Sequence, residues 1–365
     1  METIYENLSA IEWQSVVMWL IGGIMILLGI KKNMEPALLL PMGFGTILVN
    51  LPNSGAVGID GIIDILYEKG IANELFPLLL FIGIGAMIDF GPVLENPKLM
   101  IFGAAAQFGI FATLSLSSLF FDMNDAASIA IVGAADGPTS IFVANTLKSG
   151  YVGAIIVAAY SYMALVPIIQ PPVIRLLTTK KERRIRMEYT GAAVSKSARI
   201  IFPIATTVIV GLFAPKAISL VGMLMFGNLI RECGVLDSLS ETAQSVLANL
   251  ITILLGISVS ATMRAEQFLS TDTLLILGLG LFAFVFDTAG GVIVGKLINL
   301  FAKKKVNPMI GAAGISAFPM SARVINKMGL AEDSQNFLLM HAVGANVSGQ
   351  IASVVAGGII LGLFS

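Results

Sequence analysis

Two stretches of this sequence, GAADGPTSIFVAN (133–145) and GISAFPMSARVIN (314–326), decide its architecture. Both lie among strongly apolar segments, yet both carry Gly, Pro and polar residues in the middle, where a lipid-facing helix would be uniformly apolar. Irregular backbone at membrane depth is tolerated only where it is buried in protein or lines a water-filled cavity. The segments that contain them, about 126–147 and 308–328, are therefore predicted to be re-entrant or broken helices.

The composition places the surrounding chain in a membrane. Of its 365 residues, 56% are hydrophobic and 12% are charged, whereas a soluble domain carries about 25% charged residues. This balance excludes an ordinary soluble enzyme, and it equally excludes a disordered chain. The single cysteine and single histidine exclude a disulfide framework and a Cys or His metal cluster. No basic, aromatic-interleaved stripe is present to bind nucleic acid.

Apolar runs recur at the length that a bilayer requires, which is about 20 residues for a spanning helix. We count ten such runs and predict an all-α polytopic membrane protein with ten transmembrane helices and two re-entrant segments. The runs lie at about 16–30, 35–50, 73–90, 98–121, 151–174, 199–213, 217–230, 243–262, 272–300 and 336–364.

The two broken stretches align with each other, which indicates an internal repeat. We predict a first repeat over residues 1–175 and a second over 199–365, each with five spans and one re-entrant segment. Because five is odd, the second repeat enters the membrane from the opposite side, and such inverted repeats place the binding site where their interrupted helices meet. The matching pairs are Gly133/Gly314, Pro138/Pro319, Ser140/Ser321, Val143/Val324, Asn145/Asn326, Phe44-Gly45/Phe226-Gly227 and GIIDIL (61–66)/GVLDSL (234–239).

The two repeats are joined by the longest polar segment, a basic linker at 176–198. Cytoplasmic loops of membrane proteins carry an excess of Lys and Arg, so this linker is predicted to be cytoplasmic. Counting spans outward from it puts most of the remaining Lys and Arg on the same side, and both termini on the opposite side.

Asp136 is the first candidate functional residue, because it lies in the middle of the first broken stretch. A carboxylate at membrane depth is expensive unless it is paired or bound to a cation. Thr139, Ser140 and Asn145 supply further oxygen atoms nearby in the sequence, and Na⁺ is a hard cation that prefers oxygen ligands, as Ca²⁺ does. The alternative is that Asp136 caps the N-terminus of the half-helix that follows it.

The second broken stretch has Ala317 where the first has Asp136, and its charged residue is Arg323. We expect Arg323 to be buried opposite Asp136, either as its ion-pair partner or as a ligand for an anionic group, since guanidinium suits carboxylates. The alternative is that Arg323 is a cytoplasmic anchor without a role in the site. Ser316 and Ser321 add hydroxyl groups.

Three further residues are candidates with open alternatives. Tyr162 either relays a proton through its hydroxyl or packs between helices. Asn346 either contributes to the site or bonds neighbouring helices, because a buried Asn needs partners. Asp287 is a second intramembrane carboxylate. No phosphate-binding GxxxxGK[ST] motif is present, so any energy source must be an ion gradient or a partner subunit.

Four segments together resemble the β subunit of the sodium-pumping biotin-dependent decarboxylases, which act on oxaloacetate, methylmalonyl-CoA or glutaconyl-CoA. The resemblance covers nearly the whole chain, and its DGPT segment is the most specific part. The segments are VGAADGPTSIFVAN (132–145), YSYMALVPIIQPP (160–172), NPMIGAAGISAFPMSARV (307–324) and QNFLLMHAVGANVSGQIAS (335–353).

The resemblance implies that the chain decarboxylates carboxybiotin, which a partner biotin carrier subunit supplies, and couples this step to Na⁺ export with uptake of a proton from outside. It also implies a carboxyltransferase α subunit, a small membrane γ/δ subunit, a homo-oligomer of β, and a bacterial or archaeal cytoplasmic membrane as location. Residue by residue, it gives catalytic roles to Asp136, Tyr162 and Arg323. It makes Asp136, Ser316 and Asn346 the sodium ligands, and it places Asn307, Gly311, Ser316 and Arg323 on a polar pathway for carboxybiotin.

The alternative function is a stand-alone Na⁺-coupled carrier of an organic anion with elevator-type alternating access. It shares the inverted repeat, the broken segments and an arginine for a carboxylate. The two readings differ in partner dependence, since a carrier works alone in a vesicle and a decarboxylase subunit needs biotinylated partners.

Overall fold

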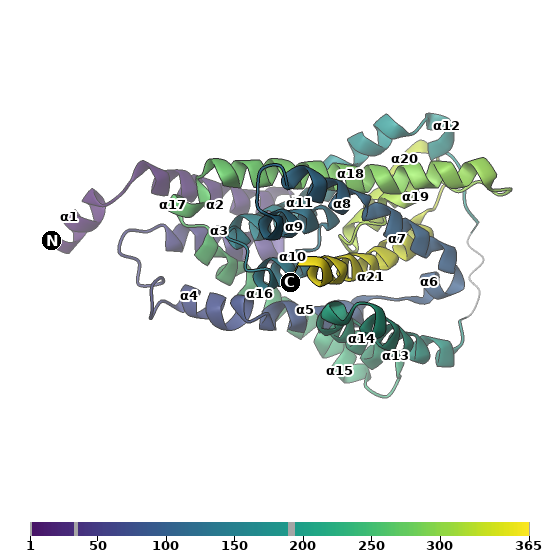
Figure 1. Ribbon diagram of the computed structural model, residues 1–365, viewed down its shortest axis with the longest axis horizontal. Helices are drawn as coiled ribbons and strands as arrows, with labels where there is room; N and C mark the ends of the chain where they lie inside the picture. Colours follow the sequence, from purple (N-terminus) through teal and green to yellow (C-terminus); the bar gives the residue numbers. More distant parts are fainter. Residues whose placement is uncertain (1, 33–35, 189–193, 365) are drawn as a thin grey trace.

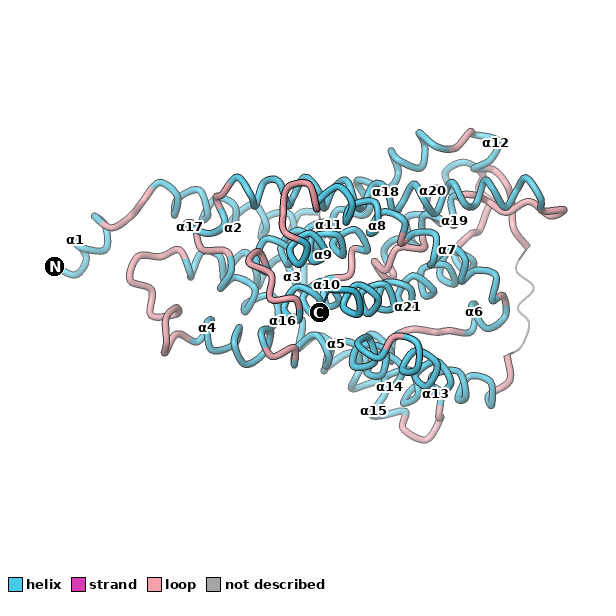
Figure 2. The backbone as a smooth tube through the Cα atoms, viewed as in Figure 1, coloured by secondary structure: helices cyan, strands magenta, loops and turns pink. Residues whose placement is uncertain are grey.

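The computed structural model describes residues 2–32, 36–188 and 194–364, and these residues form helices and connecting loops without a β-strand. Most helices run along the long axis of the molecule (Figure 1). The N-terminus lies at one end of this axis, and the short helix α12 (Lys180–Arg183), which belongs to the basic linker, lies at the other. Figure 2 shows helix at both ends and through the centre, interrupted by short loops.

The first half of the chain contains eleven α-helices before the linker, together with short 3₁₀ and π turns. They are α1 (Glu2–Ser9), α2 (Trp13–Lys32), α3 (Pro36–Val49), α4 (Ile62–Leu66), the π turn η1 (Tyr67–Ala72), α5 (Leu75–Met87), α6 (Gly91–Glu95), η2 (Pro97–Leu99), α7 (Met100–Ala106), α8 (Phe108–Ser117), α9 (Met123–Ala130), η3 (Ile131–Ala134), α10 (Gly137–Thr146) and α11 (Val152–Leu177).

The second half begins after the linker. It contains α13 (Lys196–Phe213), η4 (Pro215–Ala217), α14 (Ile218–Glu232), α15 (Asp237–Thr242), the π turn η5 (Ala243–Leu247), α16 (Ala248–Val259), η6 (Ser260–Thr262), α17 (Ala265–Phe268), α18 (Thr271–Phe301), α19 (Met309–Ala312), α20 (Met320–Glu332) and α21 (Leu339–Phe364).

Among the described residues, seven helices are long and apolar enough to span a membrane, and an eighth span is formed if Ile62–Ala72 and Leu75–Met87, which meet at 63°, count as one. The all-α polytopic fold is therefore confirmed, whereas the expected count of ten spans is not. The runs at 35–50 and 217–230 form α3 and α14, with 14 and 15 residues. At 1.5 Å per residue, both are shorter than the hydrocarbon core of about 30 Å.

The first broken stretch is a hairpin that enters and leaves at the same end of the molecule. It comprises α9, η3 and α10, and its two ends are tied together near Asp125. The Asp125 carboxylate accepts hydrogen bonds from Ser149 Oγ at 2.6 Å and from Gly150 N at 2.9 Å. We call this segment, 123–150, the first hairpin; its tip is at 134–137.

The second broken stretch forms a matching hairpin, but its ends meet at the linker. Asn307 at its start and Asn336 at its end both donate through Nδ2 to the carbonyl of Arg183, at 2.9 Å each. We call 307–336 the second hairpin; its tip is at 313–319. The two bases thus lie at opposite ends of the bundle, which is the arrangement that an inverted repeat requires.

The tips of the two hairpins meet in the core. Ser316 of the second tip donates to the carbonyl of Ala134 in the first, from its backbone N at 3.1 Å and from its Oγ at 3.0 Å. Helices of the first half also pack against helices of the second half. The pairs are α3 with α16, α5 with α14, α11 with α18 and α7 with α21. The predicted re-entrant segments are therefore confirmed, and they approach from opposite sides.

The linker is folded onto the base of the second hairpin. Arg183 forms an ion pair with Glu332 at 2.7 Å, and Arg186 forms one with Asp333 at 2.6 Å. Through these hydrogen bonds the two guanidinium groups lower the pKa of Glu332 and of Asp333. Because α11 continues to Leu177 and α13 begins at Lys196, the connection is slightly shorter than the predicted 176–198; its residues 189–193 lie outside the described part of the chain.

Candidate functional site

Asp136 lies at the tip of the first hairpin and caps α10. Its Oδ1 accepts a hydrogen bond from Thr139 N at 3.2 Å, which is the usual N-cap geometry. Its Oδ2 accepts from Ser353 Oγ of α21 at 2.8 Å. The side chain is 4% exposed, and no ion pair reaches it from the residues that the structure describes. Asp136 therefore has the geometry of the helix-capping alternative. Its two hydrogen bonds leave further lone pairs of the carboxylate free to bind another ligand.

Helix α21 presents one polar stripe to the hairpin tips, because positions four and three apart share a helix face. Asn346 donates through Nδ2 to the carbonyl of Ile315 at 2.7 Å. Gln350 donates through Nε2 to the carbonyl of Ser316, and Ser353 donates to Asp136. The first two amides therefore hold the second tip, while Ser353 holds the first.

These donations leave several buried oxygen atoms without a hydrogen-bond partner. They are Thr139 Oγ1, Asn346 Oδ1 and Gln350 Oε1, all on residues that are less than 5% exposed. Buried polar groups in proteins are normally paired, so such a group of unpaired acceptors beside a carboxylate is unusual. Oxygen acceptors of this kind are what a hard cation such as Na⁺ takes as ligands, and the donor set fits that ion.

The α10 N-terminus contributes a second electrostatic feature. The Thr139 N–H of its first turn donates to Asp136, and the partial positive charge of a helix N-terminus stabilises the carboxylate. The site thus combines one acidic group with neutral oxygen atoms. Ser316 Oγ, at the second tip, donates to Ala134 O two residues before Asp136 and lies near the carboxylate. Three predicted residues, Asp136, Ser316 and Asn346, are therefore brought to the same crossing.

Tyr162 does not face this crossing. Its hydroxyl donates to the carbonyl of Leu277 on α18, and its ring stacks on Phe284 with the centroids 6.4 Å apart. These contacts correspond to the packing alternative. The neighbouring Tyr160 points the other way: its ring fills the space where Gly137 lacks a side chain. Its hydroxyl is buried, unpaired, and close enough to Asp136 to be influenced by its charge.

Arg323 corrects the sequence-based expectation of a buried cation. It lies in the first turn of α20 and is exposed, while its neighbours Ser321 and Ala322 are buried. No carboxylate among the described residues pairs with its guanidinium. It shares the open face of α20 with Lys327, one turn further on, which is also exposed. The expected burial of Arg323 is wrong, because the second half-helix has one face turned away from the core.

Asn307 and Gly311 are placed away from the crossing. Asn307 is fully buried and joins the second hairpin to the linker through the carbonyls of Arg183 and Ile185. Gly311 lies against Gly291 of α18 so closely that a Cβ on either residue would overlap the carbonyl of the other. Both residues position the second hairpin rather than line the space around Asp136.

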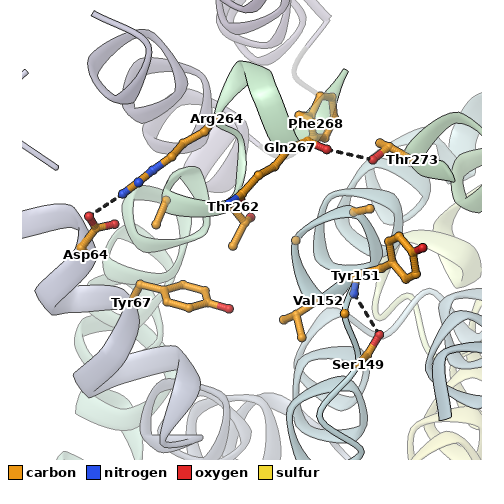
Figure 3. A pocket seen from close by; sticks show the side chains of 14 residues that line it. Asp64, Tyr67, Ser149, Tyr151, Val152, Thr262, Arg264, Gln267, Phe268 and Thr273 are labelled. Carbon is orange, nitrogen blue, oxygen red and sulfur yellow. Dashed lines mark hydrogen bonds and ion pairs between the residues drawn. The ribbon is translucent and has the colours of Figure 1, made fainter. Parts of the chain in front are cut away.

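A polar pocket of about 470 Å³ opens at the base of the first hairpin (Figure 3). On one side lie Asp64, Tyr67 and Thr262, with Arg264 ion-paired to Asp64; on the other lie Ser149 and the start of α11. Ala154 in its wall is less than two helical turns from Tyr160 along α11.

Sequence reasoning missed Gln350, Ser353, Tyr160 and the pocket. Gln350 and Ser353 follow Asn346 at helical spacing, and this signal in the last apolar run was available. Tyr160 carries no sequence signal that separates it from Tyr162. The pocket could not be predicted from the sequence, because its walls come from segments that are distant in the sequence.

Comparisons with known proteins identify the family of this chain. A family model described as the Na⁺-transporting oxaloacetate decarboxylase beta subunit matches residues 14–364. The chain is 48% identical to the glutaconyl-CoA decarboxylase subunit beta of Acidaminococcus fermentans, over 97% of this chain and 94% of that protein. It is 49% identical to the methylmalonyl-CoA decarboxylase subunit beta of Veillonella parvula, over 96% and 93%.

A further relative is the oxaloacetate decarboxylase beta chain of Klebsiella pneumoniae, which is 44% identical over 94% of both chains. The relatives thus include beta subunits named for three different substrates, at nearly equal identity. The matched region contains both hairpins and the polar stripe of α21. This chain therefore belongs to the family of Na⁺-transporting decarboxylase beta subunits.

Proposed function

We propose that this chain is the membrane subunit that decarboxylates carboxybiotin and uses the reaction to export Na⁺, with uptake of a proton from outside. The observation that carries the proposal is the crossing of the two hairpin tips, where Asp136 lies among unpaired buried oxygen atoms of Thr139, Asn346 and Gln350. Na⁺ would bind there as the transported ion, with Asp136 supplying the negative charge and Ser316 and Ser353 supplying hydroxyl oxygens.

The exposed face of α20 suits the carboxybiotin end of the reaction. Carboxybiotin is an anion, and Arg323 with Lys327 offers it positive charge beside the second hairpin. Cleavage of its N–C bond releases CO₂ and leaves the electron pair on the ureido nitrogen, which then takes a proton. A tyrosine hydroxyl suits such a transfer. Tyr162 has this role by family resemblance, and Tyr160 has the position next to Asp136.

Coupling requires that the site opens to one side at a time. We propose that the hairpins shift against the scaffold of α5, α14, α3 and α16, and that Na⁺ leaves through the pocket at the base of the first hairpin. The carboxybiotin would come from a biotin carrier subunit charged by a carboxyltransferase α subunit. A small γ/δ subunit, a homo-oligomer of this chain and a prokaryotic cytoplasmic membrane complete the proposal.

The test uses the complete complex in proteoliposomes, with Na⁺-dependent CO₂ release and ²²Na⁺ movement as readouts. Asp136→Asn is expected to abolish both, since it removes the charge that holds Na⁺ but keeps an equally good helix cap. Asp122→Asn is the matched control, because Asp122 caps α9 in the same way, through Asp125 N at 3.0 Å, but is exposed. It is expected to retain full activity.

Full Na⁺-dependent decarboxylation by Asp136→Asn would contradict the site. Na⁺-driven uptake of an organic acid by the chain alone, without CO₂ release from carboxybiotin, would instead identify a carrier.

A further inference from the structure

A second carboxylate, that of Asp287, is buried in the core on a different helix from Asp136. It lies in the middle of α18 and is 0% exposed. Asp136 and Asp287 are the two acidic residues that are buried in the described part of the chain. The function proposed above uses Asp136 and leaves Asp287 without a role.

The first oxygen of Asp287 is held by the break between α7 and α8. Oδ1 accepts a hydrogen bond from Ile110 N at 3.2 Å, and the backbone N–H of Gly109 also reaches the carboxylate. These are N–H groups of the first turn of α8, where intrahelical partners are few; Ile110 N also donates to Gln107 O at 3.2 Å. Asp287 thus caps α8 from a different helix, and this fixes the direction of its carboxylate.

The second oxygen has no hydrogen-bond partner. It faces Gly133 of the first hairpin, where an added Cβ would lie 2.6 Å from Oδ2. Gly109 similarly leaves room at Oδ1, where a Cβ would lie at 2.5 Å. Two glycines therefore form a cradle without side chains around the carboxylate. The unpaired oxygen points to the turn that leads, three residues later, to Asp136.

No positive charge is available to balance this carboxylate among the described residues. α18 packs against η3, α7, α8, α9, α11 and α19. Their ionisable side chains are Tyr160, whose ring lies against Gly137, Tyr162, whose hydroxyl is bound to Leu277 O, Asp125, which is bound at the hairpin base, and Arg175 at the exposed end of α11. On α18 itself, Lys296 is ion-paired with Glu182 and Asp272 is exposed. Lys98, in η2 just before α7, is exposed as well. An unpaired carboxylate oxygen in such surroundings is expensive.

The surroundings of Oδ2 favour a proton over Na⁺ as the missing partner. The position that a Cβ on Gly133 would take lies 2.6 Å from Oδ2 and 2.7 Å from the Ala283 methyl group, so a glycine and a methyl group lie beside this oxygen. A metal cation needs several oxygen ligands at once, whereas a proton needs a single oxygen.

We propose that Asp287 is a proton-binding site, and that Oδ2 takes up and releases one proton during each transport cycle. In the protonated state the neutral carboxyl packs against Gly133; loss of the proton leaves an anion there and favours movement of the first hairpin away from α18. The step is COO⁻ plus H⁺ to COOH, with no other bond changed. This inference rests on the proposed function, because the proton would be the one exchanged for Na⁺.

The other half of the molecule provides a comparison. There Gly314, which aligns with Gly133, lies against the Ala106 methyl group and the Phe102 carbonyl of α7. The second hairpin thus contacts an alanine where the first contacts Asp287. The proton site belongs to the first hairpin alone, and this is the hairpin that carries Asp136.

The experiment compares the complex carrying Asp287→Asn with the unaltered complex in proteoliposomes. Proton uptake is followed with a pH-sensitive dye, and the Na⁺ concentration for half-maximal rate is measured across pH. Asn keeps the shape and the bond to α8 but cannot ionise, so proton uptake is expected to fall by about a hundredfold and the pH dependence to flatten, with half-saturating Na⁺ unchanged. Asp272→Asn, exposed on the same helix, is the control and is expected to behave as the unaltered complex.

Two kinetic outcomes would overturn the proposal. An unaltered pH profile and proton uptake in Asp287→Asn would make Asp287 a helix cap only. A raised half-saturating Na⁺ with an intact pH profile would make it a Na⁺ ligand. If the unaltered complex itself moves no Na⁺, the proposed function fails, and this result is distinguishable from either outcome.

Infrared spectroscopy gives a readout that does not depend on activity or on the folding of Asp287→Asn. In Asp136→Asn, Asp287 is the remaining buried carboxyl among the described residues, so a protonated C=O band that resists deuterium exchange is expected to persist. Absence of that band across the pH range of activity would overturn the proposal.

Discussion

The contacts of a single residue in this protein depend on the direction in which its side chain points from the helix. Tyr160 and Tyr162 lie two positions apart on α11 and so face different neighbours. Tyr162 bonds to Leu277 O and stacks on Phe284, whereas the Tyr160 hydroxyl is buried beside Asp136 without a partner. A buried hydroxyl without a partner costs about 1–3 kcal/mol, so a functional role would explain why it is retained.

Removing the hydroxyl of Tyr160 or of Tyr162 shows which of the two affects Na⁺ dependence and which affects stability. Tyr160→Phe is expected to raise half-saturating Na⁺ about tenfold, which corresponds to about 1.4 kcal/mol, with an unfolding temperature that is unchanged or higher. Tyr162→Phe loses its bond to Leu277 O, so the free energy of unfolding is expected to fall by about 1 kcal/mol with a smaller change in half-saturating Na⁺. Thermal unfolding in detergent and Na⁺ titration of the decarboxylation rate measure both. The reverse pattern would return the role to Tyr162.

Between elements, the positions of the hairpins depend on contacts that only glycine permits. Gly311 of α19 and Gly291 of α18 each approach the carbonyl of the other, and a Cβ at either position would overlap it. The first hairpin has a related contact at Gly133, against Ala283 and Asp287. Such close backbone approaches between helices are typical of membrane proteins, where small residues line the interfaces.

Gly311→Ala is therefore expected to destabilise the protein, by about 1–3 kcal/mol from overpacking, and to slow Na⁺ transport by displacing the second hairpin. Gly278→Ala on α18 is the control, because no atom lies within 4 Å of its added Cβ; alanine there favours the helix by up to about 1 kcal/mol. Thermal unfolding of both variants in detergent provides the measurement. Equal unfolding temperatures would show that the α18–α19 contact adapts without strain.

The whole molecule is arranged around two hairpins that enter from opposite ends and meet at their tips. The base of the first is closed by Asp125, and the base of the second by Arg183 of the linker. The bases of both hairpins are thus held by side-chain hydrogen bonds, and their tips are joined by the hydrogen bonds from Ser316 to Ala134 O. The Asp136 site thus lies where two hairpins from opposite ends of the bundle meet.

Thiol labelling tests this topology. Cys233 is the only cysteine, so Cys233→Ser provides a background in which single cysteines report their side. Met123→Cys at the base of the first hairpin and Ser334→Cys at the base of the second are both exposed positions. A membrane-impermeant reagent added outside intact cells is expected to label the first and not the second, since the basic linker is predicted to be cytoplasmic. Labelling of both from one side would contradict the inverted arrangement.

The sequence by itself determined the class of the protein, the two re-entrant segments and the central place of Asp136. These features depend on local chemistry. Long apolar runs indicate membrane-spanning helices, and Gly, Pro and Asp within such runs indicate segments that are buried in protein, away from lipid. The family followed from the same segments. The number of spans did not, because α3 and α14 are short helices whose role depends on the α16 and α5 helices they pack against.

Only the tertiary structure decided which polar atoms share a site. Helical spacing leaves the rotation of each helix open, so Arg323 was expected to be buried and is exposed, and Tyr160 rather than Tyr162 faces Asp136. The unpaired oxygens of Thr139, Asn346 and Gln350, and the carboxylate of Asp287 over Gly133, come from segments far apart in the chain. Their proximity results from the packing of two hairpins against α18 and α21, which no single segment encodes.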